Sequence, residues 1–323
     1  MNSFTTIQKG IETETLSFPT ISIVVILYNM DREGKRTLFS LSTNYQKGVS
    51  DQDYEVIVVD NGSKPPFPKE YLKDLKGNFR YYYIENASPS PAVAINYGVL
   101  QSRGKFVGIM IDGARILTPG IIHYALRAFA AFENPVVSIL AWHLGWDIQA
   151  NAILKGYNKK AEDSLLAKIN WPEQGYRLFE ISSLAGSNID GWFMPKAESS
   201  CIFLSRENLD RLGGYDERFD KPGGGLLNLD MYRRACSLPD TDLVILLGEG
   251  SFHQLHGGAM TGKTGKEREQ LFKEWSEQYR NIRGEPFKPP DRIPHYIGHA
   301  PPQAIKFLLF SAEKFLKTKD NFL

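Results

Sequence analysis

The stretch Ile21–Leu27 (ISIVVIL) decides the fold, because it is a continuous apolar run of strand length and is rich in β-branched residues. Such a run predicts a strand that is buried on both faces, as in a parallel sheet covered by helices. Similar short runs follow at 56–59, 81–84, 106–111 and 136–141, with helical spacing between them. This alternation predicts right-handed crossovers and an α/β fold with a mostly parallel central sheet flanked by helices.

The chain is expected to divide into three parts. Residues 1–20 are polar and predict an N-terminal extension. The α/β domain is expected to span 21–262, with its last strong strand at 243–247 (LVILL). Residues 263–323 are expected to form a C-terminal helical segment, because they contain a charged helical pattern, a proline-rich link and a final amphipathic stretch.

The composition excludes several classes of protein. The hydrophobic fraction of 42% and the charged fraction of 23% are those of a globular protein of 323 residues. The net charge is +1, from 38 Lys and Arg against 37 Asp and Glu, so no nucleic-acid partner is expected. The two cysteines are too few for a disulfide scaffold.

The ends of the sequence bear on localisation. No apolar run reaches 18 residues, and the first 20 residues contain Glu12 and Glu14 without an apolar core, so a cytoplasmic protein is expected. The last stretch, from Pro302, places apolar residues broadly on one helical side with lysines around them: Ile305, Leu308, Leu309, Phe315 and Leu316. Its partner is open between a membrane surface, its own domain and a second copy in a homo-oligomer.

Two of the expected strands end in an acidic residue, Asp60 and Asp112. Ligands of open α/β sheets bind beyond the carboxyl ends of the strands. An aspartate there can accept hydrogen bonds from a nucleotide, or bind a metal that neutralises a diphosphate, or merely fix the next turn. The first strand is followed by Tyr28-Asn29-Met30-Asp31 and not by G-x-G-x-x-G, so dinucleotide binding of the usual kind is not expected.

The order of four motifs resembles family 2 glycosyltransferases of the GT-A fold. These motifs are ISIVVILYN, EVIVVDNGS, AINYGVLQSRGKFVGIMIDGA and GGYDERF, and the resemblance runs from about Ile21 to His256. It implies sugar transfer from a nucleotide-diphosphate sugar, usually with a divalent metal (Mn²⁺ or Mg²⁺). It also implies site residues: Tyr28 and Asn29 in the nucleotide pocket, Asp60 on the base, Asn96 near the ribose or diphosphate, and Asp112 as the first aspartate of the DxD motif.

The metal site departs from the family pattern. The DxD position reads Asp112-Gly113-Ala114, so its second carboxylate is missing. In the enzymes that this chain resembles, a late histidine joins the DxD carboxylate on the metal. His256 is the first candidate because glycines follow it, and His253 is the second. Two alternatives stay open: a pair of loop histidines without a metal, and a metal-free enzyme.

The acceptor side departs as well. The family's Glu-Asp pair, whose Asp is often the catalytic base, aligns with Leu227-Asn228. The nearest carboxylate is Asp230, which is expected either to serve as the base or to hold its helix. Asp216, in GGYDERF, is expected to bind acceptor hydroxyls or to fix the turn. An aromatic group is expected either to line the acceptor pocket or to belong to the core: Trp142, His143, Trp146, Trp192 and Phe193.

A further motif, Gly257–Thr264 (GGAMTGKT), matches the P-loop pattern G-x-x-x-x-G-K-[ST]. A P-loop ATPase is not expected, because FHQLH before it is a poor buried strand and no apolar strand ending in Asp follows. A loop that closes over a diphosphate, with Lys263 as a phosphate contact, fits better, and a solvated linker is the alternative.

We therefore predict a glycosyltransferase that moves a sugar from a UDP- or GDP-sugar to a saccharide or other hydroxyl acceptor. The reaction is expected to be assisted by a metal and to invert the configuration of the anomeric carbon. Its central expectation is that Asp112 and His256 converge beside the diphosphate. Two alternatives remain. One is a non-catalytic relative that binds a nucleotide sugar or glycan, and the other is a nucleotidyltransferase, which should carry a Gly- and Arg/Lys-rich loop after the first strand.

Overall fold

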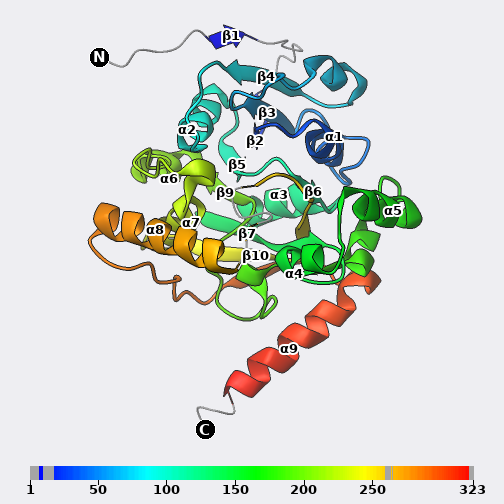
Figure 1. Cartoon of the computed structure of the whole chain (residues 1–323), viewed down its shortest axis with the longest axis vertical. Helices are drawn as coiled ribbons and strands as arrows, with labels where there is room; N and C mark the ends of the chain where they lie inside the picture. Colours follow the sequence, from blue (N-terminus) through cyan, green and yellow to red (C-terminus); the bar gives the residue numbers. More distant parts are fainter. Residues whose placement is uncertain (1–6, 10–17, 259–262, 264, 320–323) are drawn as a thin grey trace.

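A central mixed sheet organises the molecule in the computed structural model, which describes residues 7–9, 18–258, 263 and 265–319. Within these residues the sheet has eleven strands in the order β1-β4-β3-β2-β5-β9-β7-β10-β11, with β6 on β10 and β8 on β7 (Figure 1). The strands are β1 (Ile7–Lys9), β2 (Ile21–Leu27), β3 (Tyr54–Asp60), β4 (Phe79–Ile84), β5 (Phe106–Met110), β6 (Arg115–Leu117), β7 (Pro135–Leu144), β8 (Ser182–Leu184), β9 (Ile202–Ser205), β10 (Asp242–His253) and β11 (His295–Gly298).

Most of the strands run in one direction. Strands β2, β3, β4 and β5 are parallel, and so are β7, β10 and β11. Strand β9 is antiparallel to both β5 and β7, so these two groups point the same way. The carboxyl ends of seven strands therefore lie at one edge of the sheet, as the sequence predicts, and the α/β fold with a mostly parallel sheet is confirmed.

Helices cover both faces of this sheet. The α-helices are α1 (Asp31–Ser40), α2 (Ala92–Gln101), α3 (Ile121–Ala131), α4 (Gln149–Leu154), α5 (Lys159–Ile169), α6 (Arg206–Arg211), α7 (Leu227–Cys236), α8 (Gly265–Arg283) and α9 (Ile305–Lys319). Short 3₁₀ turns join some of them: η1 (Lys69–Asp74), η2 (Gly175–Ile181), η3 (Gly186–Asn188), η4 (Pro222–Gly224) and η5 (Pro302–Ala304).

The alternation of side chains along β2 explains the two layers. Ile23 and Val25 pack in one hydrophobic cluster with residues of α1 and α3. Val24 and Ile26 point the other way and pack in a second cluster with residues of α2, α6 and α7. All of β2 is buried, so its continuous apolar run is the consequence of helices on both faces. Figure 1 shows α1 and α2 on opposite sides of this part of the sheet.

A third cluster fills the region between β7, β10 and the C-terminal segment. Its centre is aromatic: Trp142, Phe179, Trp192, Phe252 and Phe307. Trp142 and Trp192 are fully buried, so they belong to the core and do not line an acceptor pocket.

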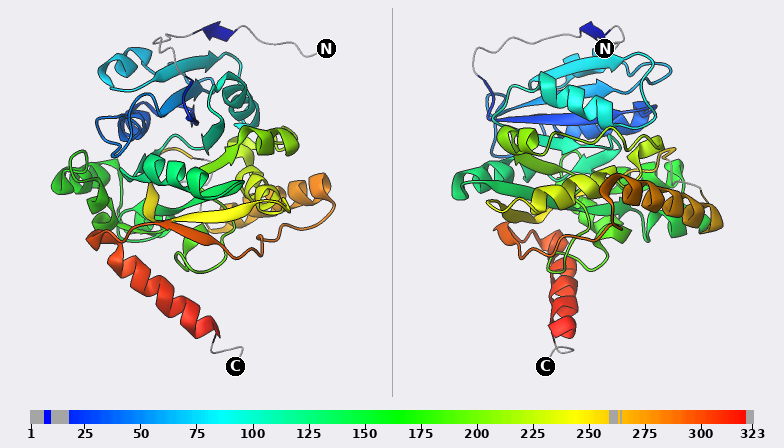
Figure 2. Two further views of the ribbon diagram at one scale, coloured as in Figure 1. Left: turned by 180° about the vertical axis from the view of Figure 1, so that it is seen from behind. Right: turned by 90° about the vertical axis from the view of Figure 1, so that its left-hand side faces the viewer.

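The segment after residue 262 contains a strand of the sheet as well as helices. Strand β11 lies within the region expected to be a link, and it pairs in parallel with β10 at the end of the sheet. Helix α9 then extends away from the rest of the molecule, as both views of Figure 2 show. No helix among the described residues combines the length and apolar character needed to cross a membrane.

Candidate functional site

The carboxyl edge of the sheet brings Asp112 beside the end of β10. Asp112 follows β5, and β6 then turns back to pair with β10, which places Arg115 opposite His253. The turn depends on Gly113, because a Cβ atom there would lie 2.4 Å from Leu27 Cδ2 and 2.5 Å from the carbonyl oxygen of Ile26. The glycine after Asp112 thus lets the acidic loop lie directly against β2.

Asp112, His253 and His256 form a compact cluster. The Nε2 atom of His253 lies 2.9 Å from Oδ2 of Asp112 and 3.0 Å from Nε2 of His256. The Nε2 atom of His256 lies 3.7 Å from Oδ1 of Asp112. One donor atom from each side chain fits within a span of 4.8 Å, close enough for all three to bind one metal ion.

The protonation of the cluster follows from burial and charge. Burial by itself would raise the pKa of Asp112, but the influence of His256, His253 and Arg115 holds that pKa well below its usual range. Burial lowers the pKa of His253, and it lowers the pKa of the neighbouring His143 to about 3. At neutral pH the site thus presents the Asp112 carboxylate beside the neutral imidazole of His253, which is the protonation state that a metal requires of these two ligands.

The loop that carries His256 is held by α1 and α5. The backbone N–H of Leu255 donates a 2.7 Å hydrogen bond to Oε2 of Glu162. The side chain of Gln254 donates to the carbonyl oxygen of Glu33 at 3.0 Å. Arg32 fixes the two acids by ion pairs of 2.8 Å to Glu33 and 2.9 Å to Glu162. The position of His256 is therefore set by a buried ionic network and not by the loop alone.

The donor set fits a divalent transition metal. Carboxylate oxygen and imidazole nitrogen together suit Mn²⁺, Fe²⁺ or Zn²⁺ better than Mg²⁺, which favours oxygen ligands. Arg115 lies on the same side, with Nε 3.4 Å from Oδ2 of Asp112. Its buried Nε and Nη1 have no hydrogen-bond partner within the described part of the chain. The cluster thus combines a metal-binding donor set with one neighbouring cation.

Tyr28, Asn29 and Asp60 lie together at the ends of β2 and β3. Tyr28 is 55% exposed at this edge. The side-chain oxygen Oδ1 of Asn29 accepts a hydrogen bond from the N–H of Lys64, and the backbone N–H of Asn29 donates one to Ser63 Oγ, both at 2.8 Å. Asp60 is fully buried and accepts hydrogen bonds from Ser63 N, Phe67 N and Tyr81 Oη. In this arrangement Asp60 fixes the 61–67 turn, and its contact with a base stays a prediction.

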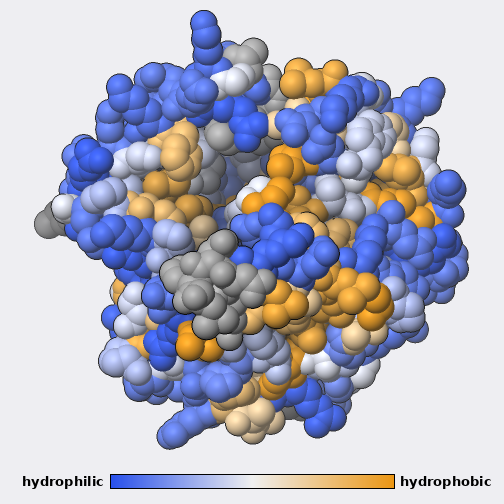
Figure 3. Space-filling view, turned by 90° about the horizontal axis from the view of Figure 1, so that it is seen from below, coloured by the Kyte–Doolittle hydropathy of each residue, from blue (hydrophilic) through white to orange (hydrophobic). Residues whose placement is uncertain are grey.

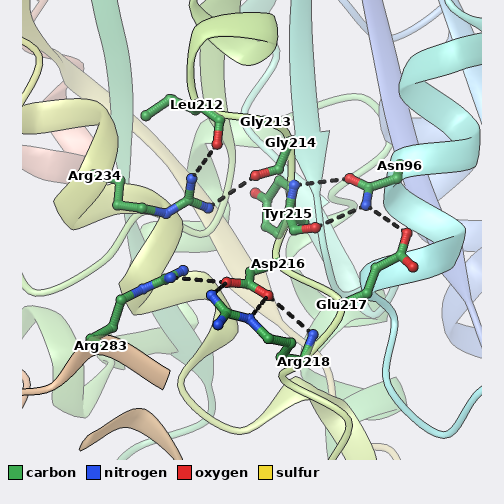
Figure 4. Close-up of a pocket in the computed structure, with 10 residues that line it drawn as sticks. All are labelled: Asn96, Leu212, Gly213, Gly214, Tyr215, Asp216, Glu217, Arg218, Arg234 and Arg283. Atoms are coloured by element: carbon green, nitrogen blue, oxygen red, sulfur yellow. Dashed lines mark hydrogen bonds and ion pairs between the residues drawn. The ribbon is translucent and has the colours of Figure 1, made fainter. Parts of the chain in front are cut away.

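Asn96 and Asp216 line a cavity of about 520 Å³ that lies outside the Asp112 cluster (Figure 4). Asn96 donates to the carbonyl oxygen of Tyr215 at 2.8 Å and to Glu217 at 3.0 Å. Asp216 pairs with Arg218 at 2.6 Å and with Arg283 at 2.9 Å. The hydrogen bonds from Arg218 hold the pKa of Asp216 below its usual range. The polar groups of this cavity are engaged with one another, so they fix the 212–218 turn.

Asp230 is not placed as a catalytic base would be. Its side chain is fully buried on α7, between two guanidinium groups. Arg234 Nε lies 2.7 Å from Oδ2, and Arg283 lies 2.6 Å from Oδ1 and 2.7 Å from Oδ2. Both oxygens are thus occupied and shielded from an acceptor. The expectation that Asp230 takes a proton is corrected, and the alternative that it holds its helix is the one that the contacts support.

Two remaining expectations lie at the margin of the site. Lys263 is exposed, and its neighbours 259–262 and 264 lie outside the described residues, so its phosphate contact stays a prediction. His143 lies beside His253, with ring centroids 5.6 Å apart, and Trp146 is 55% exposed. Sequence reasoning missed Arg115 and Glu162. The only signal for Arg115 was its short spacing from Asp112, and Glu162 had none.

The family comparison covers the first half of the sheet. Residues 22–143 match the model of Glycosyl transferase family 2, a segment that runs from β2 to β7 and includes Asp112. This segment of the chain is similar to family 2 glycosyltransferases. The expected resemblance is confirmed, while His253 and His256 lie beyond the matched segment. A comparison with curated proteins gives no match.

Two solved structures are similar to this chain. The mannosyltransferase PcManGT from Pyrobaculum calidifontis, in complex with GDP-Man and Mn²⁺, has 15% sequence identity and a TM-score of 0.50, covering 93% of this chain and 70% of its own. TarS 1-349 from S. aureus, in complex with UDP-GlcNAc, has 14% identity and a TM-score of 0.48, covering 81% of this chain and 67% of its own. The first likeness supports the GT-A fold.

Proposed function

We propose that this glycosyltransferase moves a sugar from a UDP- or GDP-sugar to a hydroxyl acceptor, with inversion, at the carboxyl edge of its sheet. The observation that carries the proposal is the convergence of Asp112, His253 and His256 on one potential metal position. The three come from two distant parts of the sequence, and they meet where ligands of open α/β sheets bind.

The cluster is proposed to hold Mn²⁺, with Mg²⁺ as the less suited ion. A divalent metal at this position would neutralise the charge that develops on the departing diphosphate. Asp112 contributes the anionic ligand. The two imidazoles supply further metal ligands in place of the second DxD carboxylate, which this chain lacks. In keeping with this proposal, a protein of the same fold, PcManGT, was solved with GDP-Man and Mn²⁺.

The remaining donor contacts are proposals for named positions. Tyr28 is exposed beside Asn29 and is proposed to lie against the nucleotide. Asp60 would contact the base, either directly or through the turn that it fixes. Asn96 and Asp216 are proposed to act on the ribose and acceptor sides, and Lys263, which is exposed, on the diphosphate.

One observation favours a second candidate function, binding of a nucleotide sugar without transfer. Asp230 has no open oxygen, and Asn228 stands where the family's Glu-Asp pair aligns, so a carboxylate base is missing at both of these positions. A chain that binds a nucleotide sugar without transferring the sugar would show this pattern. The two functions differ in a measurable way, because an enzyme would slowly hydrolyse the donor when no acceptor is present.

The experiment is a thermal-shift screen of UDP and GDP with and without Mn²⁺, followed by hydrolysis of UDP- and GDP-sugars. Metal-dependent stabilisation by one nucleotide is expected, and Asp112→Ala and His256→Ala should abolish it. A matched control exists at the opposite edge of the sheet, where His295 and Asp242 form a pair at 3.7 Å. Equal stabilisation of the site variants and of the wild type would contradict the proposal.

Helix α9 is proposed to supply the contact to a membrane surface or to a second copy. Its packed side faces the 186–196 region: the backbone N–H of Trp192 donates a hydrogen bond to Ser311 Oγ, and the hydroxyl of Thr318 donates one to the sulfur of Met194. Its opposite side leaves Ile305, Leu309 and Leu316 exposed by 40%, 67% and 60%. Figure 3 shows apolar surface gathered on this end of the molecule. Vesicle flotation and light scattering distinguish the two partners.

A further inference from the structure

The segment before β9 reaches the same edge of the sheet as Asp112. Because β9 runs antiparallel to β5, the residues that precede Ile202 lie beyond the carboxyl end of β5. Ser199 Oγ accepts a hydrogen bond of 3.2 Å from the N–H of Ile139 on β7. Ser200 Oγ lies 2.6 Å from Ser251 Oγ on β10, which is two residues, or about 7 Å, from His253. Glu198, next to these serines, therefore lies at the same edge of the sheet as the metal-binding cluster.

Glu198 is held by an amide and not by a cation. Nδ2 of Asn228 donates a 2.8 Å hydrogen bond to Oε2 of Glu198, and it also donates to the carbonyl oxygen of Ser199 at 3.0 Å. Both side chains are only partly buried. Within the described part of the chain, no ion pair and no further hydrogen bond involves Glu198. One carboxylate oxygen is thus fixed in place, and the other, Oε1, has no partner in this part of the chain.

The other carboxylates around this edge lack an open oxygen of this kind. Asp230 and Asp216 are bound to arginines. Asp60 is buried under three donors from its own turn. Glu33 and Glu162 belong to the Arg32 network that holds the histidine loop. Glu198 differs from all of these, because it is partly exposed and has a neutral partner on one oxygen alone. Glu217 also has only an amide partner, Asn96, but it lines the cavity outside the Asp112 cluster.

We propose that Glu198 accepts the proton of the attacking hydroxyl, and that Asn228 positions it. This inference rests on the proposed function. The hydroxyl oxygen forms a bond to the anomeric carbon while the bond from that carbon to the diphosphate oxygen breaks. The electron pair of the broken bond leaves with the nucleoside diphosphate. The hydroxyl proton moves to Oε1 of Glu198, and solvent later removes it.

Asn228 acts through Glu198 in this scheme. Its amide fixes Oε2 and leaves Oε1 without a partner among the described residues. An amide donor orients a carboxylate without supplying a positive charge that would compete for the incoming proton. Asn228 is therefore a positioning residue. This role would explain why an asparagine, which cannot take the proton, occupies the position where the resemblance leads one to expect an aspartate.

The test uses hydrolysis of UDP- and GDP-sugars with Mn²⁺ on the full chain, with water as the acceptor. Glu198→Gln is expected to lower kcat by about 100-fold or more, while calorimetric binding of UDP or GDP with Mn²⁺ stays unchanged. The rising limb of the kcat–pH profile should disappear in this variant, and Glu198→Asp should restore part of the rate. Glu207→Gln, an exposed acid on α6, is the matched control.

Asn228→Ala is expected to reduce kcat less than Glu198→Gln does, and to alter the pH profile. In the double variant the two effects should not add, because Asn228 acts only through the carboxylate. Wild-type hydrolysis together with an unchanged rate in Glu198→Gln would overturn the assignment of Glu198 alone. A wild type that fails to bind either nucleotide, or binds without hydrolysis, would overturn the proposed transfer reaction and this assignment with it.

Discussion

The Nε2 atom of His253 lies 2.9 Å from Oδ2 of Asp112, although one residue ends β10 and the other follows β5. The sheet produces this contact, because both strands point toward the same edge. Strand β6 then brings Arg115 back between them. The distance is a consequence of strand direction and of the tight turn at Gly113, and both can be tested by substitution.

Gly113→Ala should destabilise the protein and weaken the metal site. The new Cβ would contact Leu27 and the backbone of Ile26 at about 2.5 Å or less, so either the loop or β2 must shift. We expect a loss of about 1–3 kcal/mol in the free energy of unfolding, measured by urea denaturation, with weaker Mn²⁺ binding. Gly186→Ala is the control, because a Cβ there meets nothing within 4 Å. Equal effects of the two substitutions would contradict the account.

Asp230→Asn should act on stability and not through proton transfer. The substitution leaves Arg234 and Arg283 beside a neutral side chain in a fully buried position, which costs about 3–5 kcal/mol when a buried pair is broken. Urea denaturation measures this loss. The exposed pair of Asp240 with Arg211 provides the comparison, and Asp240→Asn should have a much smaller effect. A stable Asp230→Asn variant that has lost donor hydrolysis would restore Asp230 as a candidate base.

Lys196 should make stability depend on pH. Burial lowers the pKa of Lys196 to about 7, and its Nζ donates to the carbonyl oxygens of Trp192 and Met194. The unfolded chain keeps this proton up to about pH 10.5, so between the two values it binds more protons than the folded chain. The free energy of unfolding contributed by Lys196 should therefore rise with pH in this window.

The variant Lys196→Met removes that dependence. Its free energy of unfolding relative to the wild type should decrease by roughly 2 kcal/mol between pH 7 and pH 9. Below pH 6 the difference should be constant. Denaturation at several pH values measures the slope, and Lys306→Met, on the partly exposed start of α9, is a useful comparison. A difference that does not change with pH would show that Lys196 titrates as an ordinary lysine.

Arg115→Met should strengthen metal binding in the absence of nucleotide. The guanidinium lies 3.4 Å from Oδ2 of Asp112 and opposes a divalent cation bound to the same carboxylate. We expect Mn²⁺ affinity to rise about fivefold or more, as measured by calorimetry, and to depend less on ionic strength. Arg127→Met, an exposed arginine on α3, should leave the affinity unchanged. Weaker Mn²⁺ binding in Arg115→Met would show that the guanidinium supports the metal ligands.

Much of the fold could be predicted from the sequence, because the strands that decide it are buried on both faces. Ile21–Leu27 and the runs after it are apolar apart from single small residues such as Ser22, and the structure places them as parallel strands. The end of β10 was harder, since polar residues interrupt its apolar pattern after Leu247. Strand β11 could not be predicted either, because its residues are mostly exposed at the edge of the sheet and carry little apolar signal.

The candidate site was only partly predictable. Asp112 and the two histidines were identified from residue type and resemblance, and the structure brings them together. The role of Asp230 stayed open between a base and a helix contact, because its partner Arg283 comes from α8 and no local pattern reveals that contact. Glu198 was overlooked for the same reason, since its significance depends on Asn228, which comes from a different element.

The most direct test of the central claim is an electron paramagnetic resonance titration of Mn²⁺, in which binding removes the signal of the free ion. The account predicts that the wild type binds one Mn²⁺ ion, more tightly with UDP or GDP, and that Asp112→Ala, His253→Ala and His256→Ala each lose this binding. Asp242→Ala and His295→Ala, the matched pair at the other edge of the sheet, should bind as the wild type does. Unchanged Mn²⁺ binding in the two variants His253→Ala and His256→Ala would contradict the account.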